Sequence, residues 1–125
     1  MNGNKLLLDT NIIIYLLAGD RTLADVLHKK TIFISFITQL ELLRYKELSA
    51  KQKLMVIDFL NQSTIIDINQ EIKNNVVKLS KLYKLKLPDC IILSTGIHLD
   101  LPLLSSDKDL IKVKEVRVLY YEKWY

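Results

Sequence analysis

Residues 6–15 read LLLDTNIIIY, and this stretch decides the fold: a short apolar strand ends at an acid, and an apolar helix follows at once. A strand this hydrophobic is typical of a parallel sheet covered on both faces, and such sheets bind ligands at the carboxyl ends of their strands. A carboxylate there is costly unless a cation or hydrogen bonds compensate for it. Asp9 is therefore a candidate functional residue, although an acid after a strand can also cap the next helix.

The composition is that of an ordered globular chain. Half of the 125 residues are apolar and only five are Gly or Pro, which argues against disorder. The length predicts one domain, residues 1–125. Apolar runs are shorter than the ~18 residues of a membrane helix and no secretory segment is evident, so we expect a cytoplasmic protein without a membrane partner. The single Cys90 predicts a buried structural thiol and excludes a disulfide framework.

Strand-like and helix-like segments alternate along the chain. Apolar and β-branched runs predict strands at residues 5–8, 31–35, 64–67, 103–104 and 117–121. Helical periodicity predicts helices over residues 11–18, 22–29, 36–48, 50–61, 69–84 and 88–99. Thr10 is the expected cap of the first helix. This alternation predicts an α/β fold with three layers, in which helices flank a mostly parallel central sheet of about five short strands.

Three further acids lie where a surface residue is not expected. Glu41 projects near the apolar face of its helix, Asp89 lies in the first turn of an apolar helix, and Asp107 follows a short apolar strand. Each has an ordinary explanation: an ion pair of Glu41 with Arg44, a favourable helix dipole for Asp89, and a helix cap for Asp107. In a small parallel α/β domain, however, these acids and Asp9 can converge at one edge of the sheet.

Four carboxylates in one cleft would repel one another and raise each other's pKa values. A divalent cation removes this conflict, and Mg²⁺ or Mn²⁺ suits an all-oxygen site without Cys or His. His28 and His98 lie away from these acids in the sequence, so we expect them to be surface or packing residues. A pair of carboxylate-held metal ions suits in-line attack of water on a phosphodiester, which needs no side-chain nucleophile.

The charge balance is compatible with a polyanionic partner. The net charge is +4, from 18 Lys and Arg against 14 Asp and Glu, which does not by itself demonstrate nucleic-acid binding. Lysines recur at Lys73, Lys78, Lys81, Lys84, Lys86, Lys108, Lys112 and Lys114. Solvated helix faces are their ordinary interpretation. The aromatic tail, residues 119–125, could stack on RNA bases or close the core or a subunit interface, and we favour packing.

The segments around the four acids resemble the four motifs of PIN domains. LDTN at residues 8–11, LELL at 40–43, LPD at 87–89 and LSSDKD at 104–109 occur in the order and spacing of that family. Each motif is short, but the ordered set is specific and covers essentially the whole chain. Within the family, the chain is most similar to the VapC-type toxins of bacterial toxin–antitoxin pairs, which are small single PIN domains.

The resemblance implies an endoribonuclease that hydrolyses RNA with one or two Mg²⁺ or Mn²⁺ ions. It implies that the catalytic and metal-binding residues are Asp9, Glu41, Asp89 and Asp107. It suggests that the residues supporting these acids or contacting the phosphate are Thr10, Asn11, Ser105, Ser106 and Asp109. The family also implies a homodimer and an antitoxin protein, whose peptide enters the acidic cleft, often with a basic side chain.

Other acid-using α/β classes fit less well. A phosphoaspartyl hydrolase of the haloacid dehalogenase type has a second Asp two residues after the first, where this chain has Asn11. A receiver domain has adjacent acids after an early strand, and this early pair is absent here. No Gly-rich loop follows the first strand, so nucleotide binding of the Rossmann or P-loop kind is unsupported. Two alternatives stay open: a PIN nuclease of RNA processing or decay, and a non-catalytic RNA- or protein-binding PIN-like module.

Overall fold

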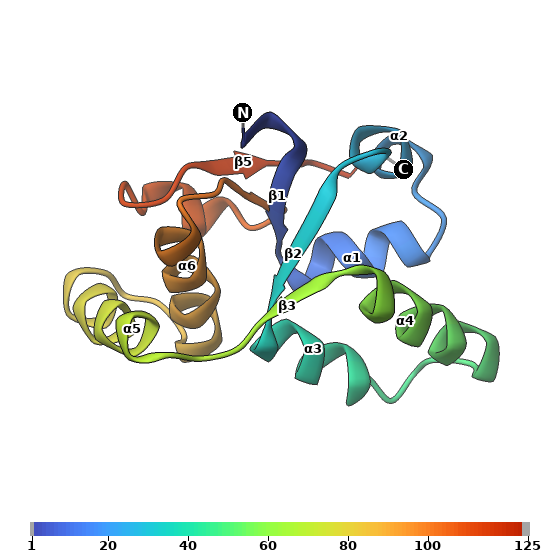
Figure 1. Cartoon of the computed structure of the whole chain (residues 1–125), viewed down its shortest axis with the longest axis horizontal. Coiled ribbons are helices and arrows are strands. Elements are labelled where there is room, and N and C mark those ends of the chain that lie inside the picture. Colours follow the sequence, from blue (N-terminus) through green and yellow to red (C-terminus); the bar gives the residue numbers. More distant parts are fainter. Residues whose placement is uncertain (1, 124–125) are drawn as a thin grey trace.

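The fold is built on a five-stranded parallel sheet (Figure 1), in a computed structural model that describes residues 2–123. The strands are β1 (Lys5–Leu8), β2 (Thr31–Ser35), β3 (Thr64–Ile66), β4 (Leu103–Ser105) and β5 (Val118–Tyr120). Their order in the sheet is β3-β2-β1-β4-β5, and every neighbouring pair is parallel. The strand β1 is therefore central, and Leu7 pairs with Phe33 on one side and with Leu103 on the other.

Helices cover both faces of this sheet (Figure 1), as the alternating pattern predicts. The helices are α1 (Thr10–Leu17), α2 (Arg21–Leu27), α3 (Phe36–Leu43), α4 (Ala50–Gln62), α5 (Gln70–Leu82) and α6 (Leu87–Leu99), with two short 3₁₀ helices, η1 (Asn2–Asn4) and η2 (Lys108–Lys112). Helices α5 and α6 pack on one face, and α1, α2, α3 and α4 contribute to the core on the other. The predicted three-layer α/β fold is confirmed.

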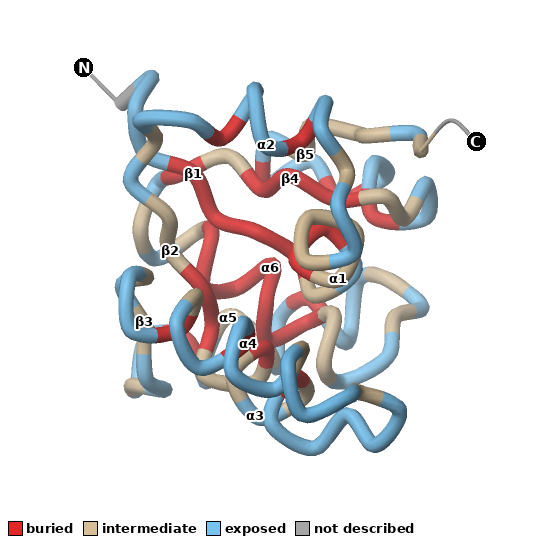
Figure 2. The backbone as a smooth tube through the Cα atoms, turned by 90° about the vertical axis from the view of Figure 1, so that its right-hand side faces the viewer, coloured by how far each residue is buried: buried red, intermediate tan, exposed pale blue. Residues whose placement is uncertain are grey.

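The central strand β1 is buried on both faces because its side chains alternate between two apolar cores. Leu6 and Leu8 belong to the core beneath α1 and α4, and Leu7 belongs to the core beneath α5 and α6. Figure 2 shows the buried backbone running through β1, β4 and α6. This double burial is the physical reason for the uninterrupted leucine run, and it fixes the position of the residue that follows, Asp9.

Helix α6 lies close against the sheet and is buried over most of its length. Pro88 lies in its first turn, as predicted, and Cys90 is a buried free thiol. Gly96 permits the close approach, because a Cβ there would lie 3.2 Å from Val116 Cγ1 and 3.5 Å from Leu7 Cδ2. This packing anchors the helix whose first turn carries Asp89.

The structure corrects one predicted helix cap and one predicted helix end beside the pocket. The first helix is capped by Asp9 and not by Thr10, because Asp9 Oδ1 accepts a hydrogen bond from Thr10 N at 2.8 Å. The helix predicted over residues 36–48 ends at Leu43. A new helix, α4, is nucleated by a capping box in which Ser49 and Gln52 bond reciprocally. Residues 44–49 therefore form a connection between α3 and α4, and not the last turns of one long helix.

The aromatic tail contributes to packing where the structure describes it. Leu119 and Tyr121 pack against the core, and the Tyr121 hydroxyl donates to Asp20 Oδ2 at 2.7 Å. Trp124 and Tyr125 lie outside the described residues. None of the helices within residues 2–123 has the length and apolar character needed to cross a membrane.

Candidate functional site

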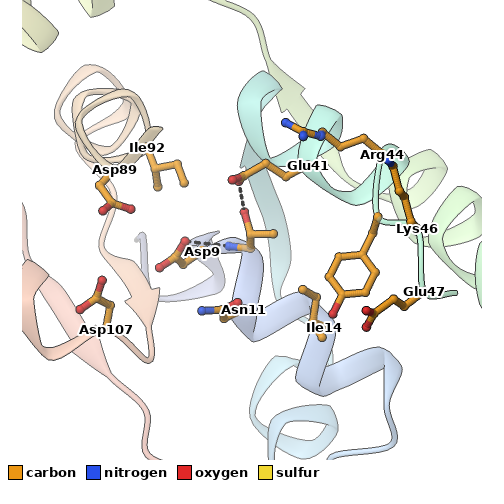
Figure 3. Close-up of a pocket in the computed structure, with 12 residues that line it drawn as sticks. Asp9, Asn11, Ile14, Glu41, Arg44, Lys46, Glu47, Asp89, Ile92 and Asp107 are labelled. Carbon is orange, nitrogen blue, oxygen red and sulfur yellow. Dashed lines mark hydrogen bonds between the residues drawn. The ribbon is translucent and has the colours of Figure 1, made fainter. Parts of the chain in front are cut away.

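A pocket of about 540 Å³ opens at the carboxyl edge of the sheet (Figure 3), and all four predicted acids line it. Asp9 follows β1 directly, and Asp107 lies two residues beyond the end of β4. Glu41 comes from α3 and Asp89 from the first turn of α6. The structure thus brings together side chains that lie up to 98 residues apart in the sequence, counting from Asp9 to Asp107.

Asp9 is held in place at both of its carboxylate oxygens. Its side chain is buried, with 7% exposure, and it accepts hydrogen bonds from Thr10 N at 2.8 Å and from the Ser105 hydroxyl at 2.7 Å. Burial raises the pKa of Asp9, the two hydrogen bonds oppose that rise, and the negative charges of Asp107 and Glu41 add to it. The carboxylate is therefore oriented by its donors but carries unfavourable charge.

Ser105 connects two of the acids. Its hydroxyl, fully buried on β4, donates to Asp9 Oδ2, and its oxygen accepts a hydrogen bond from Asp107 N at 3.0 Å. One side chain thereby fixes the Asp9 carboxylate and the backbone of Asp107 relative to each other. Asp107 in turn caps η2, because its Oδ1 accepts from Asp109 N at 2.9 Å.

Glu41 is turned towards α1 and does not form the ion pair with Arg44 that was an alternative explanation for it. The Thr10 hydroxyl donates to Glu41 Oε1 at 2.6 Å. The hydroxyls of Thr10 and Thr38 lie 3.2 Å apart, and Thr38 is buried one turn before Glu41. Thr38 was not among the predicted residues, and its only sequence signal is a hydroxyl on the same helix face as Glu41.

Asp89 carries the least compensated charge of the site. It is half-buried and its carboxylate forms no hydrogen bond with any residue of the described chain. Burial, followed by the charges of Asp9 and Asp107, raises its pKa to about 6, although Lys86 opposes the rise. Figure 3 shows the carboxylates of Asp9, Asp89 and Asp107 directed towards one shared space.

The donor set fits a hard divalent cation in its chemistry. The four acids offer only oxygen ligands, which Mg²⁺ and Mn²⁺ prefer, and their mutual repulsion is the conflict that a cation relieves. Within residues 2–123, no three Asp, Glu, His or Cys side chains are already close enough to hold an ion together. The metal-binding role of the four acids stays a prediction that rests on this chemistry.

The other predicted residues divide into two groups. Thr10 and Asn11 line the pocket, and Ser105 supports Asp9 from behind it. Ser106 and Asp109 do not line the pocket, and Asp109 reaches it only through the hydrogen bond from its backbone N–H to Asp107. A direct contact of these two side chains with a substrate phosphate therefore has no support in the geometry.

The histidines do not line the pocket, as expected for surface or packing residues, and the cysteine is buried, as predicted. His98 Nδ1 bonds the Glu71 carboxylate, and its Nε2 lies 3.1 Å from Asn69 Nδ2. His28 is exposed at the end of α2, and Cys90 is buried. None of these three side chains lines the pocket that holds the acids.

Comparisons with known proteins agree with this architecture. The family model described as PIN domain matches residues 6–116. A toxin–antitoxin complex from Klebsiella pneumoniae contains a chain that is 33% identical, with a TM-score of 0.77 and coverage of 94% of this chain and 99% of that one. VapBC-1 from nontypeable Haemophilus influenzae is 22% identical, with a TM-score of 0.79 and coverage of 93% and 97%. VapBC2 from Rickettsia felis, bound to a promoter DNA fragment, is 21% identical, with a TM-score of 0.74 and coverage of 94% and 99%. Curated proteins give no significant match.

Proposed function

The chain belongs to the PIN domain family, and from this premise we propose that it is a divalent-metal-dependent endoribonuclease and the toxin of a type II toxin–antitoxin pair. One observation carries the enzymatic part of the proposal. Asp9, Glu41, Asp89 and Asp107 come from four separate elements and line one pocket at the carboxyl edge of the sheet. A folded protein bears such a concentration of negative charge at a cost, which a bound cation would offset.

The four acids would hold one or two Mg²⁺ or Mn²⁺ ions, which supply an activated water and neutralise charge on the phosphate. The chain itself contributes the geometry. Thr10 N and Ser105 orient Asp9, and the Thr10 hydroxyl orients Glu41. In the net reaction, a water oxygen bonds to phosphorus, one P–O ester bond breaks, and the leaving oxygen takes a proton. RNA would enter the open pocket to place its phosphate beside these acids.

The toxin role rests on the relatives. The 33% identical neighbour was determined as part of a toxin–antitoxin complex, and the match spans nearly all of both chains. We infer a cytoplasmic protein with an antitoxin partner, whose basic side chain would enter the acidic pocket and compete with the metal ion. A second copy of the chain is a further expected partner, which size-exclusion chromatography with light scattering would detect.

The enzymatic proposal is tested with purified protein and a panel of structured RNAs in Mn²⁺, in Mg²⁺ and in EDTA. We expect cleavage with either metal and none in EDTA. Asp9→Asn, with its fold verified by circular dichroism, should abolish cleavage. Cleavage that survives EDTA, or that survives Asp9→Asn, would overturn the metal-dependent mechanism.

The biological role needs a separate test, because the fold is shared by nucleases with other roles. A neighbouring small reading frame that encodes a DNA-binding domain with a disordered tail would support the toxin assignment. Induction of this chain alone should arrest growth, and Asp9→Asn should relieve the arrest. RNA cleavage without growth arrest would favour RNA processing or decay, and the absence of any cleavage would favour a non-catalytic module.

A further inference from the structure

The pocket that holds the four acids has a second side of opposite charge. It is formed by Arg44, Tyr45 and Lys46, which follow α3 directly and line the same pocket as Asp9. We call these three residues the basic wall. Figure 3 shows Arg44 and Lys46 on the side of Glu41, away from Asp89 and Asp107.

The cationic groups of the basic wall are available to a ligand. Arg44 and Lys46 are exposed, and neither side chain forms a hydrogen bond or an ion pair with another residue in the part of the chain that the structure describes. Glu47 also lines the pocket and offsets part of their charge. None of the eight lysines in the recurring series lines the pocket, so the basic wall is a separate feature and not part of that solvated surface.

Tyr45 places an aromatic ring between these two cations in the sequence. Its exposure is 39%, and it lines the same pocket as Glu41. Exposed aromatic rings that alternate with Arg and Lys are typical of surfaces that bind single-stranded nucleic acid, because the cations hold phosphates while the ring stacks on a base. A base in a duplex is already stacked and is not free for such a contact.

We propose that the basic wall binds single-stranded RNA beside the phosphate to be cleaved, with Arg44 and Lys46 on backbone phosphates and Tyr45 stacked on a base. This inference rests on the proposed function and deepens it. Four carboxylates repel RNA, and an ion among them offsets that charge only locally. The cations of the wall supply the attraction that holds neighbouring phosphates. A basic peptide fits this wall poorly, since like charges would face each other.

The test compares two doubly substituted variants that each lose two positive charges. Arg44→Gln with Lys46→Gln alters the wall, and Lys51→Gln with Lys53→Gln alters exposed positions on α4 that do not line the pocket. Steady-state cleavage of a single-stranded RNA substrate should show a KM raised about tenfold or more for the wall variant, with kcat within about twofold. Losing two phosphate contacts should also reduce the slope of log affinity against log salt by about 1.4. The α4 variant should match the wild type.

Tyr45 is tested by Tyr45→Leu against Tyr45→Phe. Loss of stacking should weaken single-strand binding by roughly 5- to 100-fold in the leucine variant, and the phenylalanine variant should retain it. Binding is measured by fluorescence anisotropy with a labelled single strand and with its duplex. Equal binding of strand and duplex, or equal binding by both Tyr45 variants, would overturn the single-strand assignment.

The remaining outcomes separate this inference from the proposed function. If the wild type cleaves RNA and the wall variant has the same KM as the α4 variant, the RNA-binding role of the basic wall is overturned and the proposed function stands. A fall in kcat without a change in KM also overturns it, because the wall would then act on the acids and not on binding. If the wall variant binds RNA with normal affinity but no longer binds an antitoxin peptide, the basic wall is a surface for the protein partner, and the RNA assignment is overturned. If the wild type cleaves no RNA, the proposed function fails. The anisotropy measurements then still show whether the basic wall binds single-stranded RNA.

Discussion

Replacing Asp89 by Asn should stabilise the metal-free protein at neutral pH and should abolish the proposed nuclease activity. The Asp89 carboxylate is half-buried, faces Asp9 and Asp107, and has no hydrogen-bond donor within the described chain. Its ionised form is therefore disfavoured by folding. Asn keeps the shape of the side chain and removes the charge, so the folded state no longer carries this repulsion.

The magnitude follows from the pKa of Asp89, which rises from 3.8 to about 6 on folding. A shift of this size corresponds to about 3 kcal/mol, and solvent screening of a half-exposed group reduces it to about 1–2 kcal/mol. Loss of the favourable helix-dipole interaction in the first turn of α6 works in the opposite direction by about 0.3–1 kcal/mol. We therefore expect a net gain on the order of 1 kcal/mol, or about 3–5 °C in Tm for a chain of this length.

The gain in free energy of unfolding from Asp89→Asn should be larger at high pH than at low pH. A carboxyl group whose pKa is raised by folding holds its proton more tightly in the folded state, so stability is highest below the unfolded pKa and falls as the pH rises through the folded value. The advantage of Asp89→Asn should thus be largest at pH 7.5 and shrink as the pH falls from about 6 towards 4.

Chemical denaturation in EDTA at pH 7.5 and at pH 4.5 measures this difference for wild type and variant. Asp25→Asn provides the control, because Asp25 is exposed on α2 and lies outside the pocket. It should leave stability nearly unchanged at both values of pH. A lower stability of Asp89→Asn at pH 7.5, or a gain of the same size at both values of pH, would refute the reasoning.

Three further predictions concern the groups that support the acids. Ser105→Ala should lower the free energy of unfolding by about 1–3 kcal/mol and impair cleavage, because it leaves the buried Asp9 oxygen without its donor. Urea titrations measure the loss, and an unchanged urea midpoint would contradict it. Thr10→Val should lower activity by about 10–100-fold, whereas Thr10→Ser retains the hydroxyl bonded to Glu41 and most of the activity. Mn²⁺ at a hundred times its Kd should stabilise the wild type by about 2.7 kcal/mol relative to EDTA, and Asp9→Asn should show a smaller gain in thermal denaturation.

Much of the fold follows from local patterns in the sequence. The strand predicted at residues 31–35 matches β2, and the helix predicted over 50–61 differs from α4 by one residue. These segments have clear signals, since β-branched and aromatic residues favour the strand, and tertiary packing agrees with that preference. The meeting of Asp9 and Asp107 also follows from a general rule, because the carboxyl ends of parallel strands lie at one edge of the sheet. Glu41 and Asp89 reach the same pocket from helices.

Two kinds of feature could not be predicted from local sequence patterns. One is a contact between segments that are distant in the sequence, and the other is the end of a helix that neither Gly nor Pro marks. The helix α3 ends at Leu43, although the residues after it are compatible with a helix. The capping pattern at Ser49 and Gln52 is the sequence signal for the new helix. The basic wall lies in the connection between them, so it was concealed within the predicted helix. Local patterns also did not show which acid each hydroxyl would bond, because the Ser105 hydroxyl reaches Asp9 and the Thr10 hydroxyl reaches Glu41 across the fold. The family resemblance named both residues as supporting ones without pairing them to an acid.

The hydrogen bond from Ser105 to Asp9 spans 96 residues, and this separation has a consequence during translation. The strands β1, β2 and β3 can pair before β4 has been synthesised, but Asp9 then lacks its buried donor and Asp107 is absent. At about 5–20 residues per second, the ribosome needs roughly 5–20 s to proceed from β1 to β4. The nascent chain thus carries an incomplete acidic pocket for most of its synthesis, and the nuclease activity proposed above would require β4 to have joined the sheet.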